Sequence, residues 1–213
     1  MDTKRWLIFI AGVALLLAGI VAYDRAKDAG LPKSNGSSNI YGNKDSRVTL
    51  TEFVDFQCEA CYSYYPVVKE LKEKYKDRVK FQIRYFPISN SHKYARQAAA
   101  YAEAAARQGK FFEMHDKLFE GQKTWENSSD AASEYFDEYA KEIGLDLKKV
   151  KDDLDNPVVA ATINADLEAV KKLGGNGTPT FVLNGKKIDN PESTVSAFSR
   201  ILDNELPQQI DVE

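Results

Sequence analysis

The order in which strand-like and helix-like patterns follow one another is the strongest constraint on the fold of this chain. Apolar and polar side chains alternate over residues 48–56 and again over residues 79–85, which is the period of a β-strand. Between these segments, apolar residues recur at helical spacing, which predicts a helix over residues 61–76. A strand, a helix and a strand in this order predict a parallel βαβ unit with a right-handed crossover.

A block of helices is predicted after the second strand. No strand pattern occurs between about residues 91 and 173, and helical spacing predicts the segments 92–108, 110–122, 129–143 and 146–173. Strand signals resume after this block, so we interpret it as a helical insertion within one domain.

A β-hairpin is predicted beyond the insertion. Residues 180–183 form a short apolar run that suits a strand. The dipeptide Asn184-Gly185 follows, and it favours a two-residue hairpin turn that leads into residues 187–188.

A last helix completes the predicted α/β architecture. Helical spacing places it at about residues 191–204, and Asp189 or Asn190 is available as its N-cap. The predicted order is therefore a βαβ unit, a block of helices, a hairpin and a helix.

The N-terminal segment is uncharged over residues 6–23 and apolar on every helical face. This length and composition predict a single-pass transmembrane helix. Lys4 and Arg5 precede it and are expected to stay in the cytoplasm, which places the rest of the chain outside the cell membrane. A buried core helix and a cleaved signal peptide are the alternatives, although Ile20 is bulky for cleavage after Ala22.

The sequence predicts four successive regions. Residues 1–24 comprise a cytoplasmic tip and the membrane anchor. Residues 25–39 are rich in Gly, Ser, Asn, Pro and Lys, which cannot bury a core and predict a flexible linker. The folded domain is expected at residues 40–206, and residues 207–213 form a C-terminal tail.

Net charge and cysteine count restrict the function. The formal net charge is −3, so no basic excess is available to neutralise phosphates, and we expect no nucleic-acid partner. Only two cysteines occur, Cys58 and Cys61. Avoidance of other thiols suits an oxidising compartment, although scarcity alone would also suit a cytosolic protein.

The run Cys58-Glu59-Ala60-Cys61 lies where the first predicted strand meets the following helix. The partial positive charge and free N–H groups of a helix N-terminus stabilise a thiolate, which makes Cys58 the natural nucleophile. Cys61, one turn further on, is expected to be more buried. It would attack a mixed disulfide at Cys58 and release the substrate.

Two other interpretations of the cysteines are open. A zinc site usually needs four ligands, and His92 and His115 complete that number, but their spacing fits no compact finger. A purely structural disulfide between Cys58 and Cys61 would close too small a loop to stabilise much. We therefore expect no metal and no cofactor. We expect both histidines to be ordinary helix residues.

Glu52 is an acid on the otherwise apolar face of the first predicted strand. Burial would raise its pKa and would let it exchange a proton with Cys61 as the sulfurs open and close. The alternative is a carboxylate that reaches solvent or a lysine partner.

The run Gly177-Thr178-Pro179-Thr180 stands immediately before a predicted strand. A proline is tolerable there because it donates no hydrogen bond to the ladder, and a cis bond would let the adjacent backbone pair with an incoming peptide. A trans proline in a turn is commoner, so the residues alone do not decide between the isomers.

Together these segments resemble the DsbA-like branch of the thioredoxin superfamily. The matching stretches are Gly42-Asn43 and the run from Val54 to Cys61, then Arg84-Tyr85-Phe86-Pro87, the run from Gln108 to Asp116, and Gly177-Thr178-Pro179-Thr180-Phe181. The resemblance covers residues from about 40 to about 204. It implies a thioredoxin-like sheet with a helical insertion.

The resemblance also implies roles for individual residues. It implies a redox-active disulfide between Cys58 and Cys61, and a buried acid at Glu52. It implies a cis-proline at Pro179, packed across from the disulfide and binding substrate together with Thr178. A further implication is that Pro66 kinks the active-site helix.

The dipeptide between the cysteines departs from the pattern of many relatives. They have Pro followed by His or another residue, whereas this chain has Glu59-Ala60. An acid beside Cys58 is expected to raise its pKa and to make a milder oxidant.

The function that these features predict is protein-disulfide oxidoreductase activity, outside the cytoplasm and anchored to the membrane. The expected partners are exported polypeptides with thiols or disulfides. We expect the oxidase direction. The alternatives are a reductase or isomerase that a membrane redox partner supplies with electrons, and a redox-inactive holdase that binds peptides.

Overall fold

The computed structural model describes residues 3–29, 32–128 and 132–207 and divides into two units, residues 1–33 and residues 34–213. The first unit contains one helix, α1 (Thr3–Ala29), with exposed apolar side chains such as Leu15. Among the described residues, no helix is long and apolar enough to cross a membrane, so the predicted span is not confirmed.

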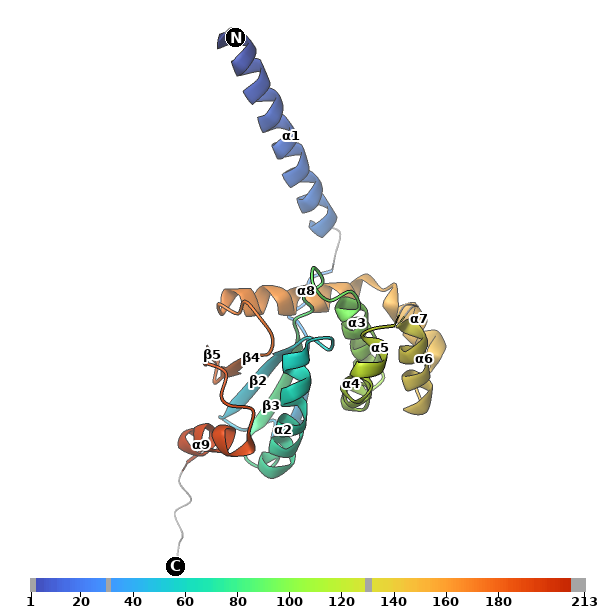
Figure 1. Ribbon diagram of the computed structural model, residues 1–213, viewed down its shortest axis with the longest axis vertical. Coiled ribbons are helices and arrows are strands. Elements are labelled where there is room, and N and C mark those ends of the chain that lie inside the picture. Colours follow the sequence, from blue (N-terminus) through green and yellow to red (C-terminus); the bar gives the residue numbers. More distant parts are fainter. Residues whose placement is uncertain (1–2, 30–31, 129–131, 208–213) are drawn as a thin grey trace, which may run out of the picture. The chain divides into compact units, whose positions relative to one another are not determined.

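The second unit is built on a five-stranded mixed sheet with the order β1-β3-β2-β4-β5 (Figure 1). Its central strands β2 and β3 are parallel, and the other neighbours pair antiparallel. The strands are β1 (Asn39–Gly42), β2 (Thr49–Val54), β3 (Lys80–Tyr85), β4 (Thr180–Leu183) and β5 (Lys186–Lys187). The parallel β2 and β3, joined through a helix, confirm the predicted βαβ unit.

Strand β2 is buried along nearly its whole length because it has a strand on either side and helices on both faces. Leu50 packs with side chains from α2 (Glu59–Tyr75) and α9 (Val195–Glu205) on one face. Phe53 packs against the opposite layer, which contains Val170. Alternation between two faces therefore holds as predicted, although both faces are buried.

The helical insertion packs on the end of the sheet that leads into α2, and its last helix also covers the face that carries Phe53. Its helices are α3 (Ala95–Arg107), α4 (Phe111–Glu120), α5 (Gln122–Trp125), α6 (Ser133–Glu142), α7 (Leu147–Leu154) and α8 (Pro157–Lys172). The break between α7 and α8 falls at Asn156, whose side chain accepts from Val158 N (2.9 Å) and caps α8. Pro157 then occupies the first turn, where the missing N–H costs no hydrogen bond.

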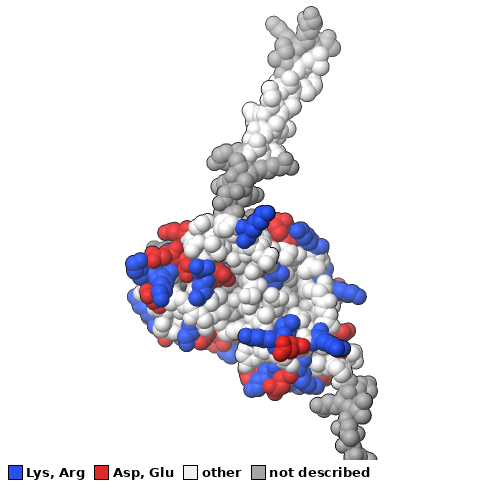
Figure 2. Space-filling view, turned by 180° about the vertical axis from the view of Figure 1, so that it is seen from behind, with Lys and Arg blue, Asp and Glu red and all other residues white. Residues whose placement is uncertain are grey.

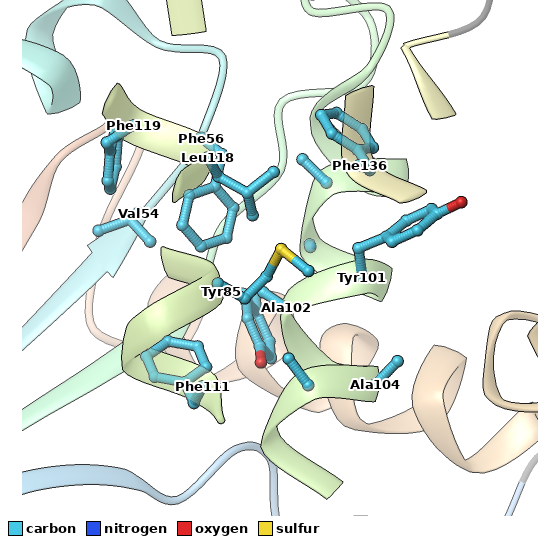
Figure 3. Close-up of a cluster of buried hydrophobic side chains, with 14 of the residues drawn as sticks. Val54, Phe56, Tyr85, Tyr101, Ala102, Ala104, Phe111, Leu118, Phe119 and Phe136 are labelled. Carbon is cyan, nitrogen blue, oxygen red and sulfur yellow. The ribbon is translucent and has the colours of Figure 1, made fainter. Parts of the chain in front are cut away.

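One apolar core joins the insertion to the sheet. Figure 3 shows side chains of the sheet end, Val54, Phe56 and Tyr85, among those of the insertion helices. Small side chains on α3 let its neighbours approach closely, since Ala98 and Ala102 are fully buried. The insertion therefore shares a core with the strand that carries the cysteines.

The surface of the domain carries charges of both signs. Figure 2 shows one face on which Lys and Arg side chains are interspersed with Asp and Glu, with an uncharged area between them. No single-sign field dominates that face.

The hairpin prediction is confirmed and the predicted start of the last helix is wrong. Asn184 and Gly185 have φ values of 49° and 81°, as a two-residue hairpin turn requires. Helix α9 begins only at Val195, because Thr194 rather than Asp189 or Asn190 is its cap.

The predicted boundary between linker and domain also needs correction. Helix α1 extends to Ala29, and residues 34–38 already belong to the domain unit. The edge strand β1 (Asn39–Gly42) was not predicted from the sequence, because its four residues show no alternation.

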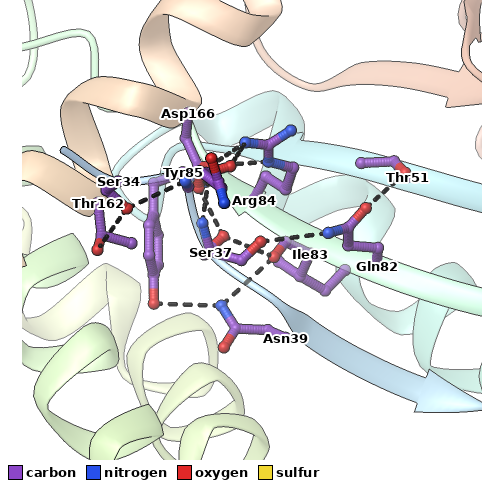
Figure 4. Close-up of polar contacts among 12 residues, drawn as sticks. Ser34, Ser37, Asn39, Thr51, Gln82, Ile83, Arg84, Tyr85, Thr162 and Asp166 are labelled. Carbon is purple, nitrogen blue, oxygen red and sulfur yellow. Dashed lines mark hydrogen bonds and ion pairs between the residues drawn. The ribbon is translucent and has the colours of Figure 1, made fainter.

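A buried carboxylate holds the start of the domain in place (Figure 4). Asp166 on α8 accepts hydrogen bonds from the Ser37 backbone (3.0 Å) and hydroxyl (2.5 Å) and from Tyr85 N (2.9 Å). It also pairs with Arg84 at 2.6 Å, and the Asp166 side chain has no exposed surface. These contacts connect the chain before β1, strand β3 and helix α8.

We predict that Asp166→Ala lowers the free energy of unfolding by about 3–5 kcal/mol, because it leaves Arg84 and several donors unpaired in a buried site. Ser37→Ala should cost only about 1 kcal/mol, since Asp166 keeps its other partners. Urea unfolding followed by fluorescence measures both. Equal losses for the two variants would contradict the central role of Asp166.

Candidate active site

The turn that carries Cys58 is fixed by the carboxylate of Asp55. Asp55 Oδ1 accepts from Gln57 N (2.8 Å), and its main-chain oxygen accepts from Cys58 N (3.1 Å). Cys58 is the N-cap of α2, which starts at Glu59, two residues earlier than predicted. The Cys58 sulfur therefore lies at a helix N-terminus, at the end of the buried strand β2.

Cys58 is partly exposed and both cysteines are free thiols. Its pKa is lowered from 9.0 to about 5, chiefly by a hydrogen bond from the Cys61 thiol, while burial opposes the change. Thr178 and the backbone N–H groups of Ala60 and Cys61 lower the pKa further. Cys58 is therefore largely a thiolate at neutral pH.

Cys61 has the opposite character. Its side chain is fully buried, and burial raises its pKa well above 9.0. The thiolate of Cys58 and the charge of Glu52 raise it further. The two sulfurs thus differ strongly in acidity, with the more acidic one facing solvent.

Glu52 lies on β2 with only 4% of its surface exposed, so it does not reach solvent. Burial raises its pKa from 4.5 to about 8, and the positive charge of Lys72 opposes this rise. Glu52 can therefore gain or lose a proton near neutral pH, and its charge acts on Cys61. Both features are what a proton acceptor for Cys61 needs.

The Pro179 loop lies across from Cys58. The Thr178–Pro179 peptide bond is cis, and Cys58 Sγ lies 3.4 Å from the Thr178 carbonyl oxygen, to which the sulfur can donate only in its protonated thiol form. The Thr178 hydroxyl is buried and has no other hydrogen-bond partner among the described residues, so it is free to donate to the thiolate. An open polar pocket of about 350 Å³ adjoins this loop and includes Asn190, whose amide donates to Pro179 O (2.9 Å).

Gln122 is a site residue that the sequence did not single out. It stands on α5, is fully buried, and donates through Nε2 to the carbonyls of Phe56 (2.7 Å) and Cys58 (3.1 Å). Nothing in its local sequence separates it from a surface glutamine. A second contact joins the same regions, since Lys123 Nζ lies 3.2 Å from the carboxylate of Glu59.

The structure does not place Glu59 among the main causes of the Cys58 pKa. Its side chain is 82% exposed, points to Lys123, and is not among the groups that set the Cys58 pKa. Solvent and the lysine screen its charge, and the hydrogen bonds to the Cys58 sulfur set the direction of the pKa shift.

The two histidines lie in different surroundings. His92 lies in a turn before α3, not in a helix as expected, and its Nδ1 is 2.8 Å from Asp55 Oδ2. His115 is buried on α4 and pairs with Asp116 at 3.0 Å. In the part of the chain that the structure describes, no group of three or more ligating side chains could hold a metal ion.

In this site a buried strand leads into a helix that begins at a CxxC pair, and a loop with a cis-proline lies opposite the first cysteine. This arrangement defines the thioredoxin class of protein. The family model described as thioredoxin matches residues 34–204. The chain therefore belongs to this thioredoxin family.

Solved structures show the same fold. A thioredoxin-like oxidoreductase from Silicibacter pomeroyi is 28% identical, with a TM-score of 0.66 over 79% of this chain and 91% of that chain. BdbD from Bacillus subtilis in its oxidised form is 24% identical, with a TM-score of 0.66 over 82% and 97% of the two chains. Wolbachia pipientis α-DsbA1 is 20% identical, with a TM-score of 0.67 over 83% and 94%.

Curated relatives include much longer proteins named Na⁺/H⁺ antiporter NhaA. The protein from Salinispora tropica is 32% identical over 191 residues, which are 87% of this chain and 28% of the relative. That from Herminiimonas arsenicoxydans is 33% identical over 70% of this chain and 23% of the relative. The chain thus spans only about a quarter of these proteins.

We predict that thiolate absorbance of the reduced protein titrates with a midpoint near pH 5 and is lost in Cys58→Ser. Cys61→Ala should raise the midpoint, because the main hydrogen bond to the thiolate is gone. A midpoint near 9 in the native protein, or a signal that persists in Cys58→Ser, would contradict the assignment.

We predict that Glu52→Gln stabilises the reduced protein at alkaline pH. The pKa of Glu52 is about 8 in the folded protein and near the ordinary value of 4.5 in the unfolded chain, so the unfolded chain ionises first and stability falls as pH rises between these values. The variant has no carboxyl group to ionise at this position. Its free energy of unfolding should therefore exceed that of the native protein by an amount that grows with pH between these values, to roughly 3–5 kcal/mol. Unfolding at a series of pH values measures it, and a constant difference would contradict a raised pKa.

Proposed function

We propose that this protein exchanges disulfides with exported polypeptides through Cys58 and Cys61. The observation that carries the proposal is the opposite shift of the two thiol pKa values, which leaves Cys58 an exposed thiolate and Cys61 a buried thiol. A stabilised thiolate is a good leaving group and favours the reduced form of the pair, so its disulfide is oxidising.

In the oxidase direction, a substrate thiolate attacks Cys58 Sγ of the disulfide. The Cys58–Cys61 bond breaks, a substrate–Cys58 bond forms, and Cys61 leaves as a thiolate that takes up a proton from Glu52. A second substrate thiol, after loss of its proton, attacks the substrate sulfur and releases the Cys58 thiolate. The substrate loses two electrons and the protein gains them, and a second disulfide compound must reoxidise the pair.

Substrate backbone would pair beside Pro179. The chain there lies across from Cys58, as the 3.4 Å contact to the Thr178 carbonyl shows, and the polar pocket next to it is open. Thr178 and Pro179 are therefore proposed to bind the residues that flank the substrate cysteine.

We predict that Cys61→Ser accumulates mixed disulfides, formed when the Cys58 thiolate attacks a substrate disulfide, because no Cys61 thiol is present to attack Cys58 Sγ and release the substrate. Cys58→Ser is the matched control and should trap nothing. Non-reducing electrophoresis of cell extracts measures both. If Cys58→Ser is the variant that accumulates adducts, the roles of the two cysteines are reversed.

We also propose that residues 6–23 anchor the chain to the cell membrane with the domain outside the cytoplasm. The support is the uncharged apolar run preceded by Lys4 and Arg5, together with the absence of cysteines outside the pair.

Protease added to intact spheroplasts should then remove the domain, and the full-length chain should sediment with membranes. A variant that lacks residues 1–24 is the control and should not sediment. A domain protected in intact spheroplasts, or a product that begins near Tyr23, would contradict the proposed anchor.

A further inference from the structure

A second pocket lies within the helical insertion, outside the redox centre. It is open, has a volume of about 580 Å³, and lies between the start of α3, the end of α7 and the first turns of α8. Leu154, Val159 and Ile163 give it an apolar lining, and Lys93 and Arg96 add positive charge. The volume is within the range of ordinary ligand pockets.

Arg96 carries an unbalanced charge. Its guanidinium is partly buried and donates to the neutral Asn164 Oδ1 at 2.7 Å. No carboxylate among the described residues forms an ion pair with it, whereas Arg84 and Arg107 pair with Asp166 and Asp153 at 2.6 and 2.8 Å. Buried charges are normally paired, so this guanidinium suits an anion from outside the chain.

Lys93 adds a second cation at the same helix end. It is exposed, and its Nζ donates to the hydroxyl of Tyr94 at 2.8 Å. The first turn of α3 contains no acid, and the partial positive charge of that helix end also favours an anion.

The pocket is connected to the redox centre. The backbone N–H of Tyr94, a lining residue, donates to Gln57 Oε1 at 2.7 Å, and Gln57 precedes Cys58. Because the pocket is open and this hydrogen bond joins it to the residue before Cys58, it suits the side chain of a polypeptide that is bound at Cys58 better than an enclosed small molecule.

We propose that this pocket binds an apolar side chain that stands next to a carboxylate in the polypeptide substrate, with Arg96 binding the carboxylate. The pocket is thus a specificity subsite for acidic–apolar segments. This inference rests on the proposed function, because it assumes that polypeptides react at Cys58.

The test uses the oxidised full-length protein and peptides with one cysteine. The peptides carry a glutamate–leucine, lysine–leucine or glutamate–serine pair at several distances from the cysteine. The second-order rate constant with which each peptide reduces the Cys58–Cys61 disulfide in a single turnover is measured beside that for glutathione. For at least one spacing, the glutamate–leucine peptide should react about tenfold faster than the other two.

Arg96→Gln should remove this preference and leave the glutathione rate unchanged. Arg96→Glu should reverse the preference toward the lysine–leucine peptide, and Arg200→Gln, at an exposed position of α9, is the matched control and should change nothing. Arg96→Lys keeps the charge and should retain part of the preference.

Equal rates for all peptides at every spacing, or a preference that survives in Arg96→Gln, would overturn the subsite. Binding of dodecanoate that depends on Arg96, without any peptide preference, would also overturn it in favour of a free fatty carboxylate. Failure of the proposed function is a separate result, because no peptide and no glutathione would then react with the native protein.

Discussion

The stabilised thiolate of Cys58 is the interaction on which the rest of the site depends. It exists because the fully buried strand β2 ends directly at the N-terminus of α2, where free N–H groups and the Cys61 thiol meet the sulfur. Burial of the same region raises the pKa values of Cys61 and Glu52, so both groups favour their protonated forms. The junction between the buried strand β2 and helix α2 therefore shifts the pKa values of Cys58, Cys61 and Glu52. All three shifts are in the direction that disulfide exchange requires.

The helical insertion acts on the redox centre through a few polar contacts. Gln122 donates to the carbonyls of the turn that carries Cys58, and Gln57 reaches across to the backbone of Tyr94. Lys123 holds the carboxylate of Glu59, which leaves that acid without a part in setting the Cys58 pKa. The insertion thus holds the cysteine turn in shape, and it also offers the pocket around Arg96 as a further contact for substrate.

Sequence predicted those features that depend on local periodicity and turn chemistry. The βαβ unit, the hairpin at Asn184-Gly185 and the burial of Glu52 all follow from alternation or from a dipeptide with special backbone preferences. It missed β1, whose four residues show no alternation. It also missed Gln122, which donates hydrogen bonds to Phe56 and Cys58, 66 and 64 positions earlier in the chain. It also missed the ion pair of Glu59, because the lysine that contacts this carboxylate lies 64 residues along the chain. Such long-range polar contacts leave no local signal.

The measurement that tests this account most directly is the reduction potential of the Cys58–Cys61 pair, obtained by equilibration with glutathione. The account ties the lowered Cys58 pKa to a stabilised reduced form, and hence to an oxidising disulfide. It predicts a potential less negative than about −250 mV, toward the oxidising end of the range for this fold. A potential more negative than about −250 mV, near that of thioredoxin, would contradict the account and would favour a reductase.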